Sequence, residues 1–274
     1  MDAESVFLWL AVVSYGFSAL SYVGGLVLKK EKLFSTGLIL AVAGLLVHVL
    51  TVALRWIKGG VLPFIEISES LTSGVLIAMI IFLIVQFSVK RIQAIGVLVM
   101  PVAFILLSWA GILTEKISGE LPASLQSYWL WVHIIAASTG FGAVLIAAAT
   151  GLLHILKEKY QTGFYEKLPE LTVLDDLSYR YIAGGFIMLG VMIISGAFWS
   201  NQVHGKFWSW DPVEVWSLIN WLMYGIFLHL RITFSWRGKR LAWYALLAVL
   251  VMIVSYWGIP FIAENFHTGF RIEH

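Results

Sequence analysis

The chain has 274 residues, of which 60% are hydrophobic and 12% are charged, with a net charge of +2. Soluble domains carry about a quarter of charged residues, so this composition excludes water as the main solvent of the folded chain. The absence of cysteine excludes a disulfide, a thiolate metal site and a cysteine nucleophile. Basic residues in such a chain report membrane topology first, so we expect no nucleic-acid partner.

Eight apolar segments are long enough to cross about 30 Å of hydrocarbon, which takes about 20 helical residues. They lie at 6–28, 36–56, 69–89, 93–113, 129–155, 181–199, 214–232 and 241–260. The sequence therefore predicts an all-α integral membrane protein with eight transmembrane helices. The first segment follows acidic residues and has no small-residue cleavage site, so we interpret it as a retained span. No linker or repeat divides residues 1–274, and we expect a single polytopic membrane domain.

The basic residues are distributed unequally between the two sides of the predicted bundle. Of the 18 lysines and arginines, five fall on one side, which leaves 13 for the other. The five are Arg55, Lys58, Lys116, Lys206 and Arg271. Under the positive-inside rule the side with five is the outside, so both termini and the loops 57–68, 114–128 and 200–213 are predicted to be external. The internal connection 157–180 is amphipathic in places, which is compatible with a position on the membrane surface.

The external connection between the sixth and seventh segments is rich in aromatic residues. Residues 196–231 include Trp199, Trp208, Trp210, Trp216 and Trp221. Tryptophan prefers the headgroup level, so an aromatic belt is the simplest interpretation. A belt does not require the acids Asp211 and Glu214, which stand among the aromatics, and Asp211–Pro212 is also a typical helix start. Indoles beside a capped helix offer broad faces and N–H donors to a large planar ligand, and we favour this interpretation.

The stretch reads GAFWSNQ…GKFWSWDPVEVW…WL.YGIFLHLR. It resembles the WWD motif of the haem-handling membrane family, and within it the CcsA (ResC) type of system II cytochrome c synthase subunits. Other similar stretches are HVLTVALRW at 48–56, SESL at 68–71, LDDLSYRYIAGGF at 174–186 and FHTG at 266–269, so the resemblance covers nearly the whole chain. Two residues depart from the pattern: His204, where an aromatic is usual, and Val213, where lysine is usual.

The resemblance implies a subunit that moves haem to the outer face of a bacterial-type cytoplasmic membrane and presents it for thioether attachment. It implies haem b as cofactor, a CcsB (ResB)-type membrane protein as partner, an apocytochrome c with a C-x-x-C-H segment as substrate, and membrane lipid as surroundings. Adding two thiols to two vinyl groups needs no side-chain acid, base or nucleophile, so we expect none. The synthase holds the haem and the thiols close together in the correct orientation, which makes the addition effectively intramolecular. The residues expected around the haem in the external loop 199–216 are Trp199, Trp208, Trp210, Asp211 and Trp216.

Two histidines are predicted to lie at the level of the external tryptophans. His133 is four residues into the fifth segment, and His267 follows the eighth. A lone membrane histidine is often a packing residue, but two at one level beside an aromatic platform fit axial ligation of haem iron better. In the family that the chain resembles, the matching histidines are the external haem ligands.

A third histidine, His229, is placed much deeper. It follows Glu214 by fifteen residues, or about 22 Å of helical rise, so one haem cannot touch it and the outer pair together. The resemblance implies that His229 ligates haem iron inside the membrane, with a second histidine from the CcsB-type partner. We interpret His48, about 12 Å below the outer end of its helix, as structural. No role is assigned to His154, His204 and His274, although His204 could be a spare ligand.

Arg55 and Lys58 lie on the external side, where they could pair with haem propionates, although Arg55 could equally snorkel. Glu69 begins a helix, where a carboxylate is favoured by the dipole. Three other functional classes remain open: a haem transporter or chaperone of the CcmC branch, a HemX-type regulator of haem synthesis, and an ion-coupled transporter. Eight spans and His229 favour the CcsA type over CcmC, and few acids occupy the midplane that a transporter would use.

Overall fold

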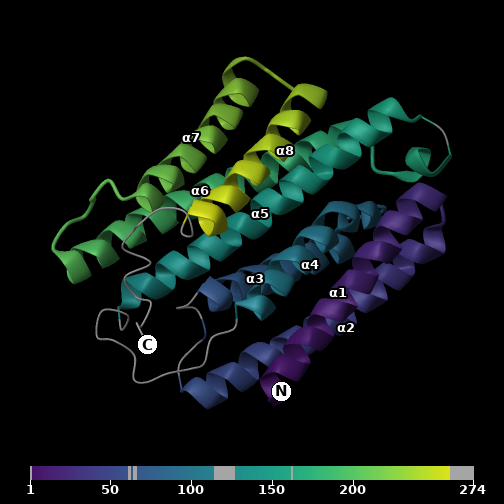
Figure 1. Cartoon of the computed structure of the whole chain (residues 1–274). Coiled ribbons are helices and arrows are strands. Elements are labelled where there is room, and N and C mark those ends of the chain that lie inside the picture. The colour runs from purple at the N-terminus through teal and green to yellow at the C-terminus, as the bar shows by residue number, and fades with distance from the viewer. Residues whose placement is uncertain (1, 61–62, 64–66, 114–126, 162, 260–274) are drawn as a thin grey trace.

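The computed structural model describes residues 2–60, 63, 67–113, 127–161 and 163–259. Within these ranges it has eight helices long and apolar enough to span a membrane (Figure 1), which confirms the predicted all-α membrane fold. The helices are α1 (Ala3–Leu28), α2 (Glu31–Gly59), α3 (Ile67–Ser88), α4 (Gly96–Ile112), α5 (Tyr128–Lys159), α6 (Leu171–His204), α7 (Pro212–Thr233) and α8 (Lys239–Ile253). Three short helical segments accompany them: η1 (Gln93–Ile95), η3 (Gly163–Lys167) and η4 (Val254–Gly258).

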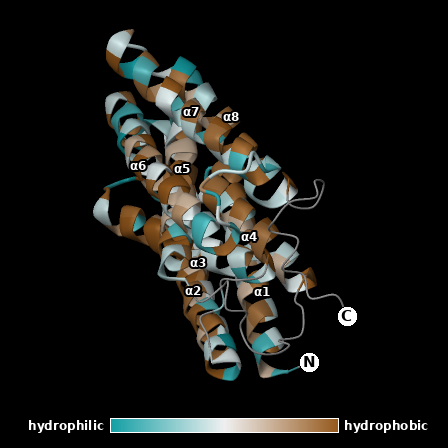
Figure 2. Ribbon diagram, turned by 90° about the vertical axis from the view of Figure 1, so that its left-hand side faces the viewer, coloured by the Kyte–Doolittle hydropathy of each residue, from teal (hydrophilic) through white to brown (hydrophobic). Residues whose placement is uncertain are grey.

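Successive helices run in opposite directions, so the bundle has two ends. The α6–α7 connection, which carries Trp208 and Trp210, lies at the end where α1, α3, α5 and α7 begin, and we name this the tryptophan end. Hydrophobic residues cover the lengths of the helices, while hydrophilic residues gather toward their ends (Figure 2). Large apolar side chains such as Leu20, Leu46 and Leu247 are mostly exposed along these lengths. Hydrocarbon, not water, is the solvent that such a surface requires.

The helix α6 differs most from its predicted span. The sequence suggested a span at 181–199 and a surface position for 157–180, whereas α6 begins at Leu171 and continues for 34 residues. Leu174, Ser178 and Ile182 recur at four-residue intervals and are all buried, so one packing face continues through the charged turn at its start. By helical rise α6 is about 51 Å long, more than the hydrocarbon layer. The prediction of a surface segment is therefore wrong from Leu171 onward.

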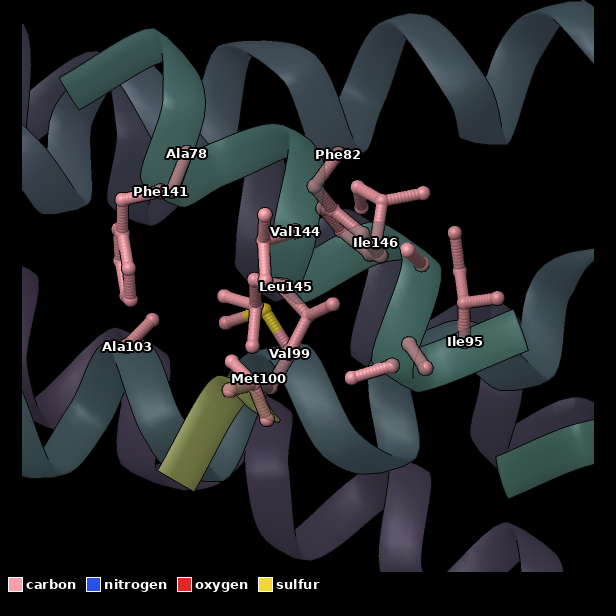
Figure 3. Close-up of a cluster of buried hydrophobic side chains, with 14 of the residues drawn as sticks. Ala78, Phe82, Ile95, Val99, Met100, Ala103, Phe141, Val144, Leu145 and Ile146 are labelled. Carbon is pink, nitrogen blue, oxygen red and sulfur yellow. The ribbon is translucent and has the colours of Figure 1, made fainter. Parts of the chain in front are cut away.

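The helix α5 lies at the centre of the bundle. It contacts α3 and α4 on one side and α6 and α8 on the other. Every residue from Gly140 to Gly151 is buried, as expected of a helix enclosed all round. Its small residues let neighbouring backbones approach closely, since a Cβ added at Gly142 would lie 3.0 Å from the Ala78 Cα. Figure 3 shows side chains from α3, η1, α4 and α5, among them Phe82, Met100 and Leu145, filling the space between these elements.

Candidate functional site

The α6–α7 connection at the tryptophan end is short and tightly capped. The helix α6 ends at His204, followed by Gly205 at a left-handed φ of 71°, and α7 begins after Asp211. The Asp211 carboxylate accepts from the Val213 N–H at 2.8 Å, while Glu214 accepts from the Ser209 N–H at 2.8 Å and the Asp211 N–H at 3.3 Å. This is a capping box, which confirms Asp211 as the predicted N-cap. The connection is residues 205–211, shorter than the 199–216 loop that the sequence suggested.

The tryptophans of this region differ in their surroundings. Trp199 lies within α6 and is buried against Leu130 of α5. Trp208 is half-buried, and its Nε1 is enclosed without a hydrogen-bond acceptor among the described residues. Trp210 is 73% exposed and meets Trp208 edge-on, with ring centroids 5.9 Å apart. Trp216 lies in α7 and is half-buried. Trp208 and Trp210 therefore form the accessible part of the predicted platform, while Trp199 packs α6 onto α5.

His133 lies in the first turns of α5, and its ring is oriented by α6. Its Nδ1 lies 2.8 Å from the carbonyl oxygen of Met192. Because a carbonyl can only accept, Nδ1 carries the ring proton, and Nε2 carries the lone pair that a metal ligand needs. Histidines that bind metals typically have such a partner on the other ring nitrogen. Gly196 allows the close approach, since a Cβ there would lie 2.7 Å from the His133 Nδ1.

An aromatic ladder accompanies His133 at the tryptophan end. Trp129, one helical turn before His133, stacks on Phe198 of α6 with ring centroids 4.6 Å apart. Phe198 in turn meets Phe207 edge-on at 5.7 Å. The sequence interpretation named none of these three residues. The four-residue spacing of Trp129 and His133, which places both on one face of a helix, was the available signal.

Two of the remaining histidines have surroundings that bear on their predicted roles. His229 is exposed on α7, near the end opposite the tryptophan end, and its Nδ1 lies 3.2 Å from the Thr233 hydroxyl. His48 is completely buried, and its Nδ1 lies 3.3 Å from the Tyr15 hydroxyl of α1. That contact supports the structural interpretation of His48.

The other histidines are less informative about a ligand site. His154 is buried near the end of α5 opposite the tryptophan end. His204 is exposed in the last turn of α6, whereas the sequence suggested a position in the loop. His267 and His274 lie outside the described residues.

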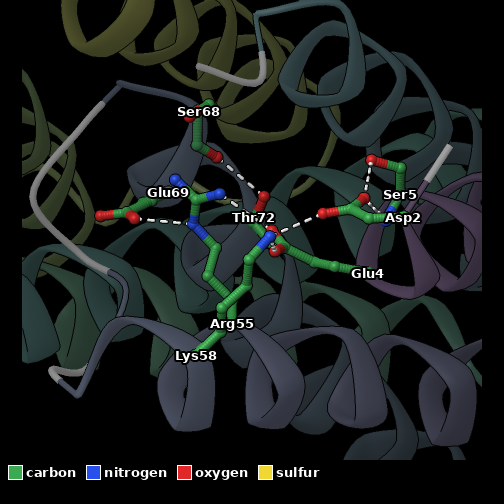
Figure 4. A network of polar contacts seen from close by, with 8 residues as sticks. All are labelled: Asp2, Glu4, Ser5, Arg55, Lys58, Ser68, Glu69 and Thr72. Carbon is green, nitrogen blue, oxygen red and sulfur yellow. Dashed lines mark hydrogen bonds and ion pairs between the residues drawn. The ribbon is translucent and has the colours of Figure 1, made fainter. Parts of the chain in front are cut away.

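The two basic residues considered as partners for propionates are instead engaged by acids of this chain (Figure 4). Arg55 contacts Glu69 at 2.7 Å and Glu4 at 2.9 Å, and all three side chains are largely buried. Lys58 pairs with Asp2 at 2.7 Å. The hydrogen bonds from Lys58 and Ser5 hold the pKa of Asp2 well below its ordinary value. The network joins α1, α2 and α3 at the tryptophan end.

A second ionic network fixes the opposite end of α7, close to His229. Arg231 donates to Asp175 and, at 2.9 Å, to Asp176, both in the first turns of α6. Asp175 also accepts from the Gly238 N–H at 2.8 Å. The charged turn of α6 thus binds both the end of α7 and the start of α8.

Comparisons with known proteins identify relatives of this chain. Residues 64–267 match the family described as cytochrome C assembly protein. The cytochrome c biogenesis protein CcsA of Guillardia theta is 31% identical, with 92% of this chain and 91% of that protein covered. The CcsA of Chlamydomonas reinhardtii is also 31% identical, with 92% and 73% covered.

The fold also matches a solved structure, named cytochrome c heme lyase CcmF. The TM-score is 0.72 at 15% sequence identity, with 98% of this chain covered, and the chain spans 48% of the length of that protein. At this identity the likeness bears on the fold alone. Because the family match covers most of the chain and the CcsA relatives are 31% identical over 92% of it, the chain belongs to the family of CcsA-type cytochrome c assembly proteins.

Proposed function

We propose that this protein is the membrane subunit of a cytochrome c synthase that moves haem to the outer face of the membrane and presents it to apocytochrome c. Its membership of the cytochrome c assembly family supports a role in that process. The observation that carries the finer proposal is the hydrogen bond from the His133 Nδ1 to the Met192 carbonyl. It leaves Nε2 as the nitrogen with the chemistry of an axial iron ligand.

The residues at the tryptophan end fit a haem b. A haem needs an axial nitrogen, flat apolar contacts and donors for its two carboxylates. His133 has the required tautomer, Trp210 exposes a broad aromatic surface, and the enclosed Trp208 Nε1–H has no acceptor among the described residues. A buried donor without an acceptor is costly, and a ligand carboxylate would relieve that cost. We therefore propose that Trp208, Trp210 and the half-buried Trp216 contact the haem.

The proposed reaction depends more on how haem and the cysteine thiols are positioned than on reactive side chains of the protein. The bound haem supplies two vinyl groups, and the cysteine thiols of the C-x-x-C-H segment add across them, with sulfur bonding one carbon and the thiol hydrogen going to the other. His133 orients the ring system, with His267 proposed as the second axial ligand. Asp211 and Glu214 hold the connection that carries Trp208 and Trp210. Holding the two reactants in the correct relative orientation raises their effective concentration for the addition.

His229 is proposed to hold haem in transit, with a second histidine supplied by a CcsB-type partner. His229 is exposed on the face of α7 that points away from the bundle. Ile219, Leu222 and Ile226, which lie nearer the tryptophan end of α7, are also exposed. An ionisable side chain on such a face is a functional candidate by default.

We propose that the tryptophan end faces outward across a bacterial-type cytoplasmic membrane, on the basis of the five basic residues on that side against 13 on the other.

The ligand assignment is tested in cells that carry the CcsB-type partner and a reporter cytochrome c. His133→Ala and His267→Ala should each lower the haem retained by the purified complex and abolish cytochrome c maturation. Added imidazole should partly restore both by occupying the vacated axial position. His204→Ala removes the exposed histidine at the same end that the sequence left open as a spare ligand, and we expect it to behave as wild type, which would assign ligation to His133 and His267. Normal maturation in the His133→Ala, His267→Ala double variant would refute the assignment.

The transport assignment is tested separately through His229. His229→Ala should lower the total haem of the complex and leave the outer ligands intact, because the two levels are about 22 Å apart by helical rise. Haem supplied from outside should then restore maturation to His229→Ala and not to the outer double variant. Equal haem content in wild type and His229→Ala would show that His229 has no part in transport.

A further inference from the structure

Met192 of α6 connects His133 to the end of α8. Its carbonyl oxygen accepts from the His133 Nδ1–H at 2.8 Å. Its sulfur accepts from the Tyr256 hydroxyl at 2.9 Å. Met192 itself is buried. One residue of α6 therefore contacts both the proposed haem ligand on α5 and the turn that follows α8.

Tyr256 lies in η4, where the backbone departs from the α-helix. The segment η4 is a π-helical turn, Val254–Gly258, and such turns are rare and occur frequently at functional sites. The next residue, Trp257, is buried and meets Phe141 of α5 edge-on, with centroids 4.8 Å apart. Phe141 follows His133 by about two helical turns. The turn is thus held to α5 through Trp257 and to α6 through Tyr256.

The Met192 carbonyl that orients His133 also lies close to the Ser195 hydroxyl of its own helix. The Ser195 hydroxyl lies 3.1 Å from the same oxygen and 2.6 Å from the Val191 carbonyl. A shift of α6 relative to α5 would lengthen the 2.8 Å bond between the His133 Nδ1 and the Met192 carbonyl, on which the orientation of the ring depends. A contact that holds Met192 in place therefore affects the ring.

We propose that Tyr256 is a positioning residue for the haem ligand: through the Met192 sulfur it holds α6 where its carbonyl orients the His133 ring. This inference rests on the proposed function, in which His133 ligates haem iron. Tyr256 does not touch the haem in this arrangement; it acts through Met192.

The chain offers a closely matched control in Tyr224. This tyrosine is buried, whereas Tyr256 is half-buried, and its hydroxyl donates to the Ala248 carbonyl at 3.0 Å and lies 3.6 Å from the Met252 Sδ. Its contacts join α7 to α8 and do not involve Met192. Removing its hydroxyl deletes a hydrogen bond to the Ala248 carbonyl beside a methionine sulfur, and so tests whether the loss of a tyrosine hydroxyl in this part of the bundle is by itself enough to speed haem loss.

The experiment measures haem loss from the purified complex with its CcsB-type partner to an excess of apomyoglobin, together with the Soret spectrum. Tyr256→Phe and Met192→Leu should each speed haem loss roughly two- to tenfold, the effect of one hydrogen bond, and shift the spectrum alike. The double variant should be no worse than either single variant, because both remove one contact. Tyr224→Phe should match wild type. Wild-type haem loss in Tyr256→Phe, or additive effects in the double variant, would overturn the proposal.

A second arm separates this inference from the ligand assignment on which it rests. In a His133→Gly variant reconstituted with imidazole, the added ligand is not tied to Met192, so Tyr256→Phe should have no further effect. The same loss of haem in that background would show that Tyr256 acts on packing and not through His133. If His133→Gly alone retains haem as wild type does, the ligand assignment fails first, whatever Tyr256→Phe does.

Discussion

Substituting Gly196 tests the His133 geometry without touching the histidine. A Cβ at this position would lie 2.7 Å from the His133 Nδ1 and 3.0 Å from its Cε1. The ring must retreat by about 0.7 Å to reach ordinary van der Waals contact, which takes the 2.8 Å bond to Met192 out of the normal hydrogen-bond range. Loss of such a partner typically lowers metal affinity about 10- to 100-fold. Gly196→Ala should therefore release haem at least tenfold faster.

The matched control is Gly184→Ala on the same helix, where an added Cβ meets nothing within 4 Å. Alanine stabilises a helix by up to about 1 kcal/mol relative to glycine, so neither substitution weakens α6 itself. Haem loss to apomyoglobin and thermal unfolding are measured for both variants. Equal haem retention in Gly196→Ala and Gly184→Ala would refute the reasoning that the α6 backbone orients His133.

Three further predictions follow from described contacts. Asp211→Ala removes the N-cap of α7 and should lower stability by about 0.5–2 kcal/mol, measured by thermal unfolding, with Asp211→Asn retaining most of it. Arg55→Ala removes the cation shared by the buried Glu4 and Glu69 carboxylates, leaving Glu4 with Lys58 at 3.9 Å, and should cost about 2–4 kcal/mol, again by thermal unfolding; an unchanged midpoint would contradict the buried network of Figure 4. Single cysteines in the cysteine-free chain test orientation: Lys206→Cys should react with an impermeant thiol reagent outside the cell and Lys30→Cys should not, and the reverse would invert the topology.

The elements that the sequence predicted well are those decided by local signals. The length of each apolar run is enough to predict eight spans, because no other structure buries so many consecutive apolar residues. The cap at Asp211 follows from residue types at fixed spacing along a few positions of chain. Both features depend on neighbours in sequence and on little else.

The contacts that the sequence could not predict join residues far apart in the chain. One partner of Arg55 is Glu4, 51 residues away, and a partner of His133 is Met192, 59 residues away. An interpretation based only on charge and depth in the membrane therefore suggested that Arg55 could pair with a haem propionate. The early start of α6 has the same cause, because Arg231 compensates the acids of its first turns only once α7 has packed beside it.

The helices α5 and α7 are buried to different extents, and this difference determines how freely the amino-acid sequence of each can change between species. In α5, 67% of the most apolar stretch is buried, against 17% in α7. A substitution in α5 must fit several neighbouring helices at once, whereas Ile219, Leu222 and Ile226 on the outward face of α7 can exchange with any apolar residue while hydrocarbon covers them. His229 on that face is the exception, because the Thr233 hydroxyl contacts one of its ring nitrogens and lipid offers no hydrogen-bonding partner to the other. Lineages that retain a histidine there while the residues around it drift would preserve a contact that lies outside this chain.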